Sequence, residues 1–143
     1  MIFICYLPAD FFGGNMKKQT LNSNRVRKIN GSFSFIPHKF IREGFINELN
    51  SEELLLYFFL ILVSDSQGIS YYSDKNICKL TGLSFEDIDE SRTNLKALDL
   101  IAFNSPVYQI LELPFKPVQR KSIYHIPDNF HRLQKIAKKF NNG

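Results

Sequence analysis

Cysteine, histidine and tryptophan are scarce in this 143-residue chain, which has two Cys, three His and no Trp. Cys5 and Cys78 form no CxxC motif and no cluster with histidine, which favours free thiols in a reducing cytoplasm over a disulfide framework. The histidines show no ligand spacing with any acidic residue. We therefore expect no metal site and no cofactor.

Catalytic motifs and long apolar runs are also missing. The sequence has no glycine-rich phosphate loop, nucleophile elbow or metalloprotease motif, so we expect a protein that is not an enzyme. The apolar run at residues 54–63 is about half as long as a bilayer-spanning helix needs. The opening MIFICYL is too short for a signal sequence and has no positive residue before it. We expect a cytoplasmic chain with no membrane partner.

Charge is divided sharply along the chain. Residues 17–28 carry five basic and no acidic side chains, residues 29–115 carry six basic and twelve acidic ones, and residues 116–143 carry seven basic and one acidic. An acidic body therefore lies between two basic ends, and the net charge of +4 describes none of the three parts. The basic ends indicate a polyanionic partner, since Lys and Arg displace counterions from nucleic acids.

These divisions predict three segments. We expect residues 1–30 to form a flexible arm, residues 31–114 a compact domain, and residues 115–143 a basic tail with an amphipathic helix. Met16 is a second candidate for the initiator, which would leave residues 1–15 outside the native start.

Capping signals predict the first helices of the compact domain. Pro37 suits the first turn of a helix. The apolar residues expected on the buried side of that helix are Phe40, Ile41, Phe45 and Leu49. Asn50 and Glu53 match a capping box that opens a second helix, ending near Val63. Because this second helix is apolar all round, it must be covered on every side, either by its own domain or, on one face, by a second copy in a homodimer.

A second pair of helices is predicted around a tight turn at residues 81–83. Ser73 would cap a short helix over residues 74–80, and Ser84 would cap a longer one that ends near Leu98. The residues expected to lock these helices together are Leu80, Leu83, Ile88 and Leu95, and Phe85, Ile88, Leu95 and Leu98 form the expected inward face of the longer helix.

Strand signals are short. Residues 31–35 alternate briefly and suggest a strand, and residues 69–72 are β-prone. Residues 100–103 and 107–113, separated by Asn-Ser-Pro, predict a β-hairpin.

In this order the elements resemble the winged helix-turn-helix domains of bacterial transcription regulators and of plasmid or phage replication initiators. The stretches that carry the resemblance are LNSEEL from residue 49, QGIS from residue 67, ICKLTGLS from residue 77 and LKALDLI from residue 95. Asp99 departs from the pattern, because many relatives have glycine there. The resemblance covers about residues 35–114 and implies a mainly α fold with a small β-wing. It also implies a DNA-binding accessory regulator of transcription, replication initiation or a mobile element.

Candidate contacts to double-stranded DNA follow from the resemblance and from the basic ends. The longer helix would face the major groove, and its neighbour would approach the backbone. The basic arm would lie along a minor groove, and tail lysines would bind phosphates. The candidates are Arg25, Arg27, Lys28, Lys75, Lys79, Ser84, Arg92, Asn94, Lys96, Lys135, Lys138 and Lys139.

Four acidic residues at the start of the groove-facing helix complicate this interpretation: Glu86, Asp87, Asp89 and Glu90. They would stabilise the helix through its dipole, or accept hydrogen bonds from cytosine, or dock a basic protein partner. The third interpretation gives the alternative function, a winged-helix protein–protein interaction module with an acidic face and no specific DNA binding.

Overall fold

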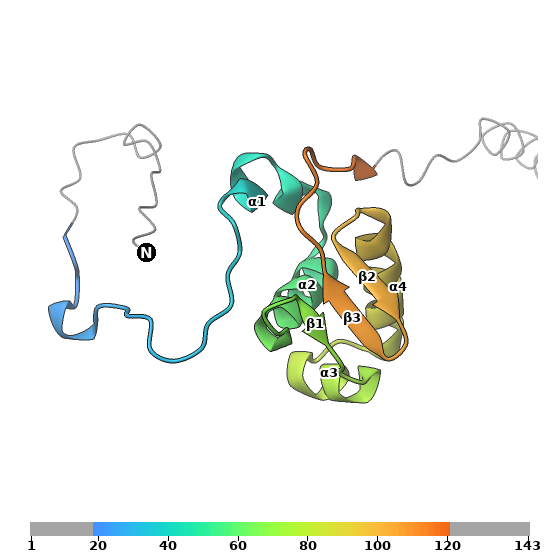
Figure 1. Ribbon diagram of the computed structural model, residues 1–143, viewed down its shortest axis with the longest axis horizontal. Helices are drawn as coiled ribbons and strands as arrows, with labels where there is room; N and C mark the ends of the chain where they lie inside the picture. The colour runs from blue at the N-terminus through green and yellow to red at the C-terminus, as the bar shows by residue number, and fades with distance from the viewer. Residues whose placement is uncertain (1–18, 121–143) are drawn as a thin grey trace, which may run out of the picture.

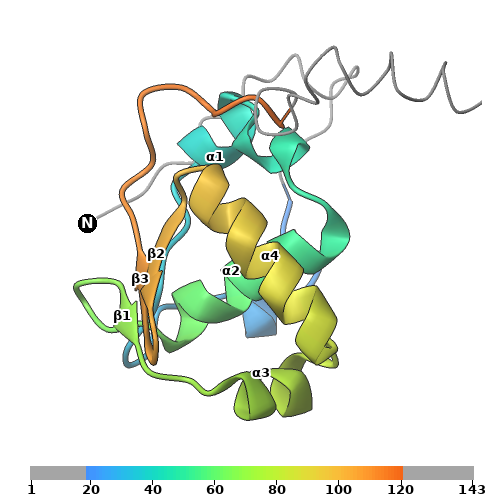
Figure 2. The ribbon, with the colours of Figure 1, turned by 90° about the vertical axis from the view of Figure 1, so that its right-hand side faces the viewer.

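The computed structural model describes residues 19–120. They form four α-helices, two 3-10 helices and a three-stranded antiparallel sheet (Figures 1 and 2). The amphipathic helix expected in the basic tail, with Lys135, Lys138 and Lys139, lies outside the described residues. Within residues 19–120, no helix combines the length and the apolar character needed to cross a membrane.

The N-terminal segment, residues 19–38, is exposed throughout, and its first part lies well away from the helices (Figure 1). Its one regular element is a 3-10 helix, Ser23–Arg25. The strand expected at residues 31–35 is absent. The alternating side chains Phe33 and Phe35 are 63% and 74% exposed, so no surface buries them and the pattern selects no strand.

The first expected helix is split in two. α1 (Lys39–Arg42) is followed, after Gly44, by a 3-10 helix (Phe45–Glu48). Phe40 and Phe45 are buried, and the Phe40 ring stacks on Tyr57 with centroids 5.3 Å apart. Ile41 was expected to be buried, but it is 61% exposed, because the interruption breaks the helical spacing on which that expectation depended.

α2 (Ser51–Val63) begins with the expected capping box. The Glu53 backbone N–H donates to Asn50 Oδ1 at 2.8 Å, and the Asn50 N–H donates to Glu53 Oε2 at 3.0 Å. Leu56 and Leu60 are completely buried and face the other helices. Within the described residues one side of the helix is exposed. The domain therefore does not cover the helix completely, and the alternative, a second copy on one face, stays a prediction.

α3 (Asp74–Thr81) and α4 (Phe85–Ala97) have the predicted caps, Ser73 and Ser84. Gly82 joins them in a left-handed conformation, φ 80°, that residues with a Cβ rarely adopt. The contact between the two helices is made by Ile77, Leu83, Ile88 and Leu95. Leu80 was expected in this contact and Phe85 on the inward face of α4, but they are 62% and 61% exposed. The buried face of α4 is centred near Ser91 and Leu95, which turns Phe85 outwards.

The sheet contains β1 (Ile69–Ser70), β2 (Ile101–Asn104) and β3 (Val107–Ile110) in the order β1-β3-β2. β2 and β3 form the expected hairpin, with Phe103 opposite Tyr108. β1 is shorter than the β-prone stretch that predicts it. The sheet lies beside the helices (Figure 2), in a layout compatible with helices plus a wing. Asp99, between α4 and β2, has a left-handed backbone with φ 60°, which explains why a glycine would suit that position.

The segment after the sheet returns to the helices. Lys39 Nζ donates to the Pro114 carbonyl at 2.9 Å, and Val118 packs against the core. Arg120 contacts Glu48 and Glu53, so interactions with the body continue past residue 114.

Candidate nucleic-acid interface

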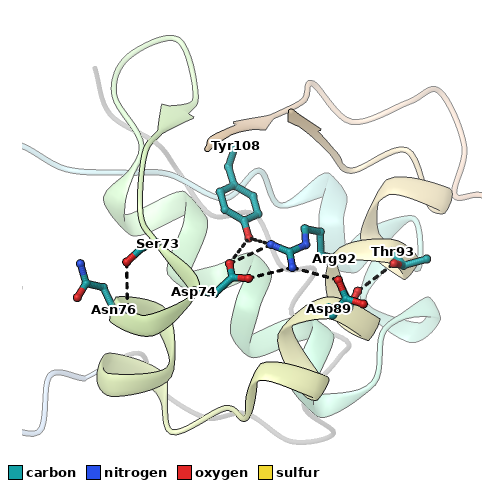
Figure 3. A network of polar contacts seen from close by, with 7 residues as sticks. All are labelled: Ser73, Asp74, Asn76, Asp89, Arg92, Thr93 and Tyr108. Carbon is teal, nitrogen blue, oxygen red and sulfur yellow. Dashed lines mark hydrogen bonds and ion pairs between the residues drawn. The ribbon is translucent and has the colours of Figure 1, made fainter. Parts of the chain in front are cut away.

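Arg92 was predicted to be available to DNA, but it is locked inside the body (Figure 3). Its guanidinium donates to both Asp74 carboxylate oxygens at 2.9 and 3.0 Å, to Asp89 at 3.1 Å and to the Tyr108 hydroxyl at 2.6 Å. It also lies 4.5 Å from the centroid of the Phe103 ring. Only 11% of the side chain is exposed. Arg92 therefore joins α3, α4 and the hairpin, and its Nη1 and Nη2 groups already donate to internal partners.

The electrostatics of this cluster favour a fixed charge. Burial lowers the pKa of Arg92, but hydrogen bonding to Asp74, together with the nearby Tyr108 and Asp89, raises it further than burial lowers it. Burial raises the pKa of Tyr108 to about 12. The phenol therefore stays protonated and donates to Asp74 at 3.2 Å. The cluster therefore connects α3, α4 and the hairpin through polar contacts.

Asn94 was also predicted on the exposed face of α4, and it is buried with 6% exposure. Its amide donates to Glu53 Oε1 at 2.8 Å. Arg120 donates to both oxygens of the same carboxylate, at 2.7 and 3.0 Å, and to the Glu48 carbonyl at 3.0 Å. Asn94 therefore helps to hold a buried carboxylate and is not a base reader in this structure.

Glu53 is the centre of this second cluster and is completely buried. Burial raises its pKa, but hydrogen bonds from Arg120, the Asn50 backbone and Asn94 outweigh burial and hold the pKa below its usual value of 4.5. The carboxylate is therefore ionised at neutral pH. The sequence signal for this role was limited to the capping box, since Asn94 and Arg120 lie 41 and 67 residues away from Glu53.

The remaining candidates on the body are Lys75, Lys79, Lys96 and Ser84, and all four are exposed. The three lysines form no ion pair within residues 19–120. The Ser84 hydroxyl donates to Asp87 at 2.7 Å and accepts from the Asp87 backbone N–H at 3.0 Å, so the helix cap already uses it. Three lysines, one on α4 and two on α3, are thus the candidate cations left on the body.

The four acidic residues of α4 divide into two pairs. Asp87 completes the cap, and hydrogen bonds from Ser84 lower its pKa. Asp89 accepts from Arg92. Glu86 and Glu90 are exposed and make no hydrogen bond or ion pair with the described part of the chain. Helix stabilisation therefore accounts directly for two of the carboxylates and leaves two facing solvent.

The basic arm is exposed along its whole described length. Residues 19–30 are exposed throughout, and in Figure 1 they lie well away from the helices. Arg25 is in the short 3-10 helix, and Arg27 and Lys28 follow in a stretch without regular secondary structure. None of the three forms an ion pair with residues 19–120. Their charges are therefore available to an external anion.

The described residues contain no group of three or more His, Cys, Asp or Glu side chains suited to a metal ion. A groove of about 830 Å³ runs between the N-terminal segment and the body, with Phe33, Tyr57, Ile61 and Leu113 among its lining residues. It contains none of the candidate contacts. The chain matches no protein-family model, no curated protein and no solved structure.

Proposed function

We propose that this chain is a winged-helix protein that binds double-stranded DNA through its basic arm. The observation that carries the proposal is the exposure of Arg25, Arg27 and Lys28 without an ion pair in the described chain. Such residues displace counterions from the phosphate backbone and provide affinity with little sequence preference. The protein would act as an accessory factor in transcription, replication initiation or the movement of a mobile element.

The layout of the body supports the winged-helix part of the proposal. α2, β1, α3, α4 and the β2–β3 hairpin follow one another in that order, and β1 pairs with β3 across the sheet. In a winged-helix domain, α4 would be the groove-facing helix and the hairpin would be the wing. The hairpin tip, Asn104-Ser105-Pro106, carries no cation.

α4 itself is a poor source of DNA affinity. Glu86 and Glu90 are exposed, and a carboxylate within about 8 Å of a phosphate is repelled at physiological salt. Arg92 and Asn94 are held by internal partners. The body would therefore orient the protein on DNA, while the arm holds it there.

The arm is tested by removing its charge. With Arg25, Arg27 and Lys28 changed to Gln, we expect the plot of log affinity against log salt for a mixed-sequence duplex to become shallower by about 2–3, because each lost phosphate contact reduces the slope by about 1. Fluorescence anisotropy across a salt series measures both slopes.

The matched control retains the charges, with Arg25→Lys, Arg27→Lys and Lys28→Arg. It should keep the slope of the natural chain. Equal slopes for the charge-removed variant and the natural chain would contradict the role of the arm.

A second function is favoured by the surface at the turn between α3 and α4. Leu80 and Phe85 are 62% and 61% exposed, and Phe85 adjoins Glu86 in sequence. An apolar surface with unpaired carboxylates suits a basic, partly apolar protein partner. The double substitution Glu86→Gln and Glu90→Gln separates the two functions. It should strengthen duplex binding if DNA is the ligand, whereas an interaction module would not bind duplex even in dilute salt.

A further inference from the structure

α2 exposes an apolar stripe on the side opposite its buried face. Leu55, Phe58 and Leu62 are 39%, 46% and 55% exposed, although Leu56 and Leu60 of the same helix are completely buried. Their spacing of three and four residues places them in one line along the helix. After Glu53 the helix has no charged residue, so the stripe has no polar edge of its own.

The stripe is too small to hold two copies together by itself. Half-exposed side chains of this size offer on the order of 100 Å² each, and a stable interface needs about 800 Å² per partner. An additional segment of the same chain needs far less area, because its local concentration is high.

We propose that residues 128–140 of the same chain dock on this stripe as an amphipathic helix. Apolar residues recur there at helical spacing, and they are Phe130, Leu133, Ile136, Ala137 and Phe140. A helix over residues 129–140 would be about 18 Å long, close to the about 20 Å of the 13-residue α2. The stripe from Leu55 to Leu62 rises about 10 Å and the tail line from Phe130 to Phe140 about 15 Å, so the tail is long enough to cover the whole stripe.

The end of the described chain places this segment within reach. Arg120 is bonded to Glu48 and to Glu53, which lies in the first turn of α2. Residues 121–128 span up to about 26 Å when extended. The route to the outer side of α2 passes around a helix about 10 Å in diameter, so the linker is long enough.

If the apolar residues of the docked helix face the stripe, its basic side chains point outward. On a helical wheel Lys135, Lys138 and Lys139 lie on the side away from Leu133 and Phe140, and Arg132 borders the apolar side next to Ile136. The docked tail would therefore form a fixed basic ridge on an acidic body. The docking itself does not depend on DNA binding, and its test contains no DNA.

Because the chain contains no tryptophan, a single introduced tryptophan reports on its own surroundings. In the intact chain, Phe58→Trp places a single indole on the stripe, and Tyr71→Trp places one at a site that is 68% exposed and off the stripe. We expect the emission of the Phe58→Trp variant to lie at shorter wavelength than that of the Tyr71→Trp variant, and to be quenched less by acrylamide. Adding Leu133→Gln and Ile136→Gln should move it to the wavelength of the exposed reporter.

The matched control adds Lys135→Gln and Lys138→Gln, on the basic side of the segment, and should leave the Phe58→Trp emission unchanged. Circular dichroism checks that each variant is folded. The proposal is overturned if the Phe58→Trp indole is already as exposed as the Tyr71→Trp indole, or if the apolar tail substitutions do not move its emission. It is also overturned if the emission depends on protein concentration and sedimentation shows a dimer, because a second copy would then cover the stripe.

Discussion

Replacing Arg120 with Met is expected to lower the free energy of unfolding by about 3–5 kcal/mol at pH 7, because removing one partner of a buried ion pair leaves the other charge uncompensated. Glu53 is completely buried, and Arg120 donates to both of its oxygens. Urea denaturation followed by circular dichroism measures the difference. Lys116→Met, at an exposed position in the same segment, is the control and should cost little.

The loss should depend on pH. In the natural chain the pKa of Glu53 lies below 4.5, so its stabilising contribution is complete above pH 4.5 and is lost as the pH falls through the lower folded value. Without Arg120, burial dominates and raises the pKa of Glu53. The variant then regains stability relative to the natural chain as the pH falls from 7, because the buried carboxyl takes up a proton.

A double variant isolates the buried charge. Glu53→Gln added to Arg120→Met removes the uncompensated carboxylate, so it should recover part of the lost stability at pH 7 and abolish the pH dependence of the deficit. A deficit below about 1 kcal/mol in Arg120→Met, within the range of exposed pairs, would show that the pair does not support the fold.

Replacing Arg92 with Met is the second large effect. We expect a loss of about 2 kcal/mol, because the change removes hydrogen bonds to charged groups on α3 and α4 and to the Tyr108 hydroxyl on the hairpin. The loss should be smaller than for Arg120, since Asp74 and Asp89 are 34% and 79% exposed and water can solvate them.

The same variant separates a structural role for Arg92 from base reading. If Arg92 is a scaffold residue, the folded variant keeps the duplex affinity and salt slope of the natural chain at a temperature well below its unfolding transition. Lys96→Met, on an exposed position of the same helix, is the control for stability and should leave it unchanged. A stable Arg92→Met variant with weakened DNA binding would reverse the assignment.

Local signals in the sequence predicted much of the helical framework. Asn50, Ser73 and Ser84 each cap the helix that was expected, because a cap depends on residues three positions apart. The hairpin was predicted for the same reason, since its two strands are separated by a short turn. The strand at residues 31–35 was predicted wrongly, because alternation alone does not provide a partner strand.

Local signals did not predict which residues at the edge of a helix face are buried. They also did not predict which residues pair across long stretches of sequence. Arg92 pairs with Asp74 and Tyr108, which are 18 and 16 residues away, and Asn94 pairs with Glu53 across 41 residues. No local pattern indicates such pairs, so both residues were assigned to DNA from their residue type and their expected place on the groove-facing helix. Phe85 was assigned to the core by its spacing, but the inward face of α4 is rotated towards Ser91.

The most direct test of the central claim measures how fast lysines of the full-length chain react with acetic anhydride. The reaction is run on the free protein and on the protein bound to a mixed-sequence duplex, and mass spectrometry of peptides measures the modification of each lysine. The arm and α4 each carry one exposed lysine in the described part of the chain, Lys28 and Lys96. We predict that DNA protects Lys28 and leaves Lys96 as reactive as in the free protein. Protection of Lys96 without protection of Lys28 would contradict the account, because α4 rather than the arm would then hold the duplex.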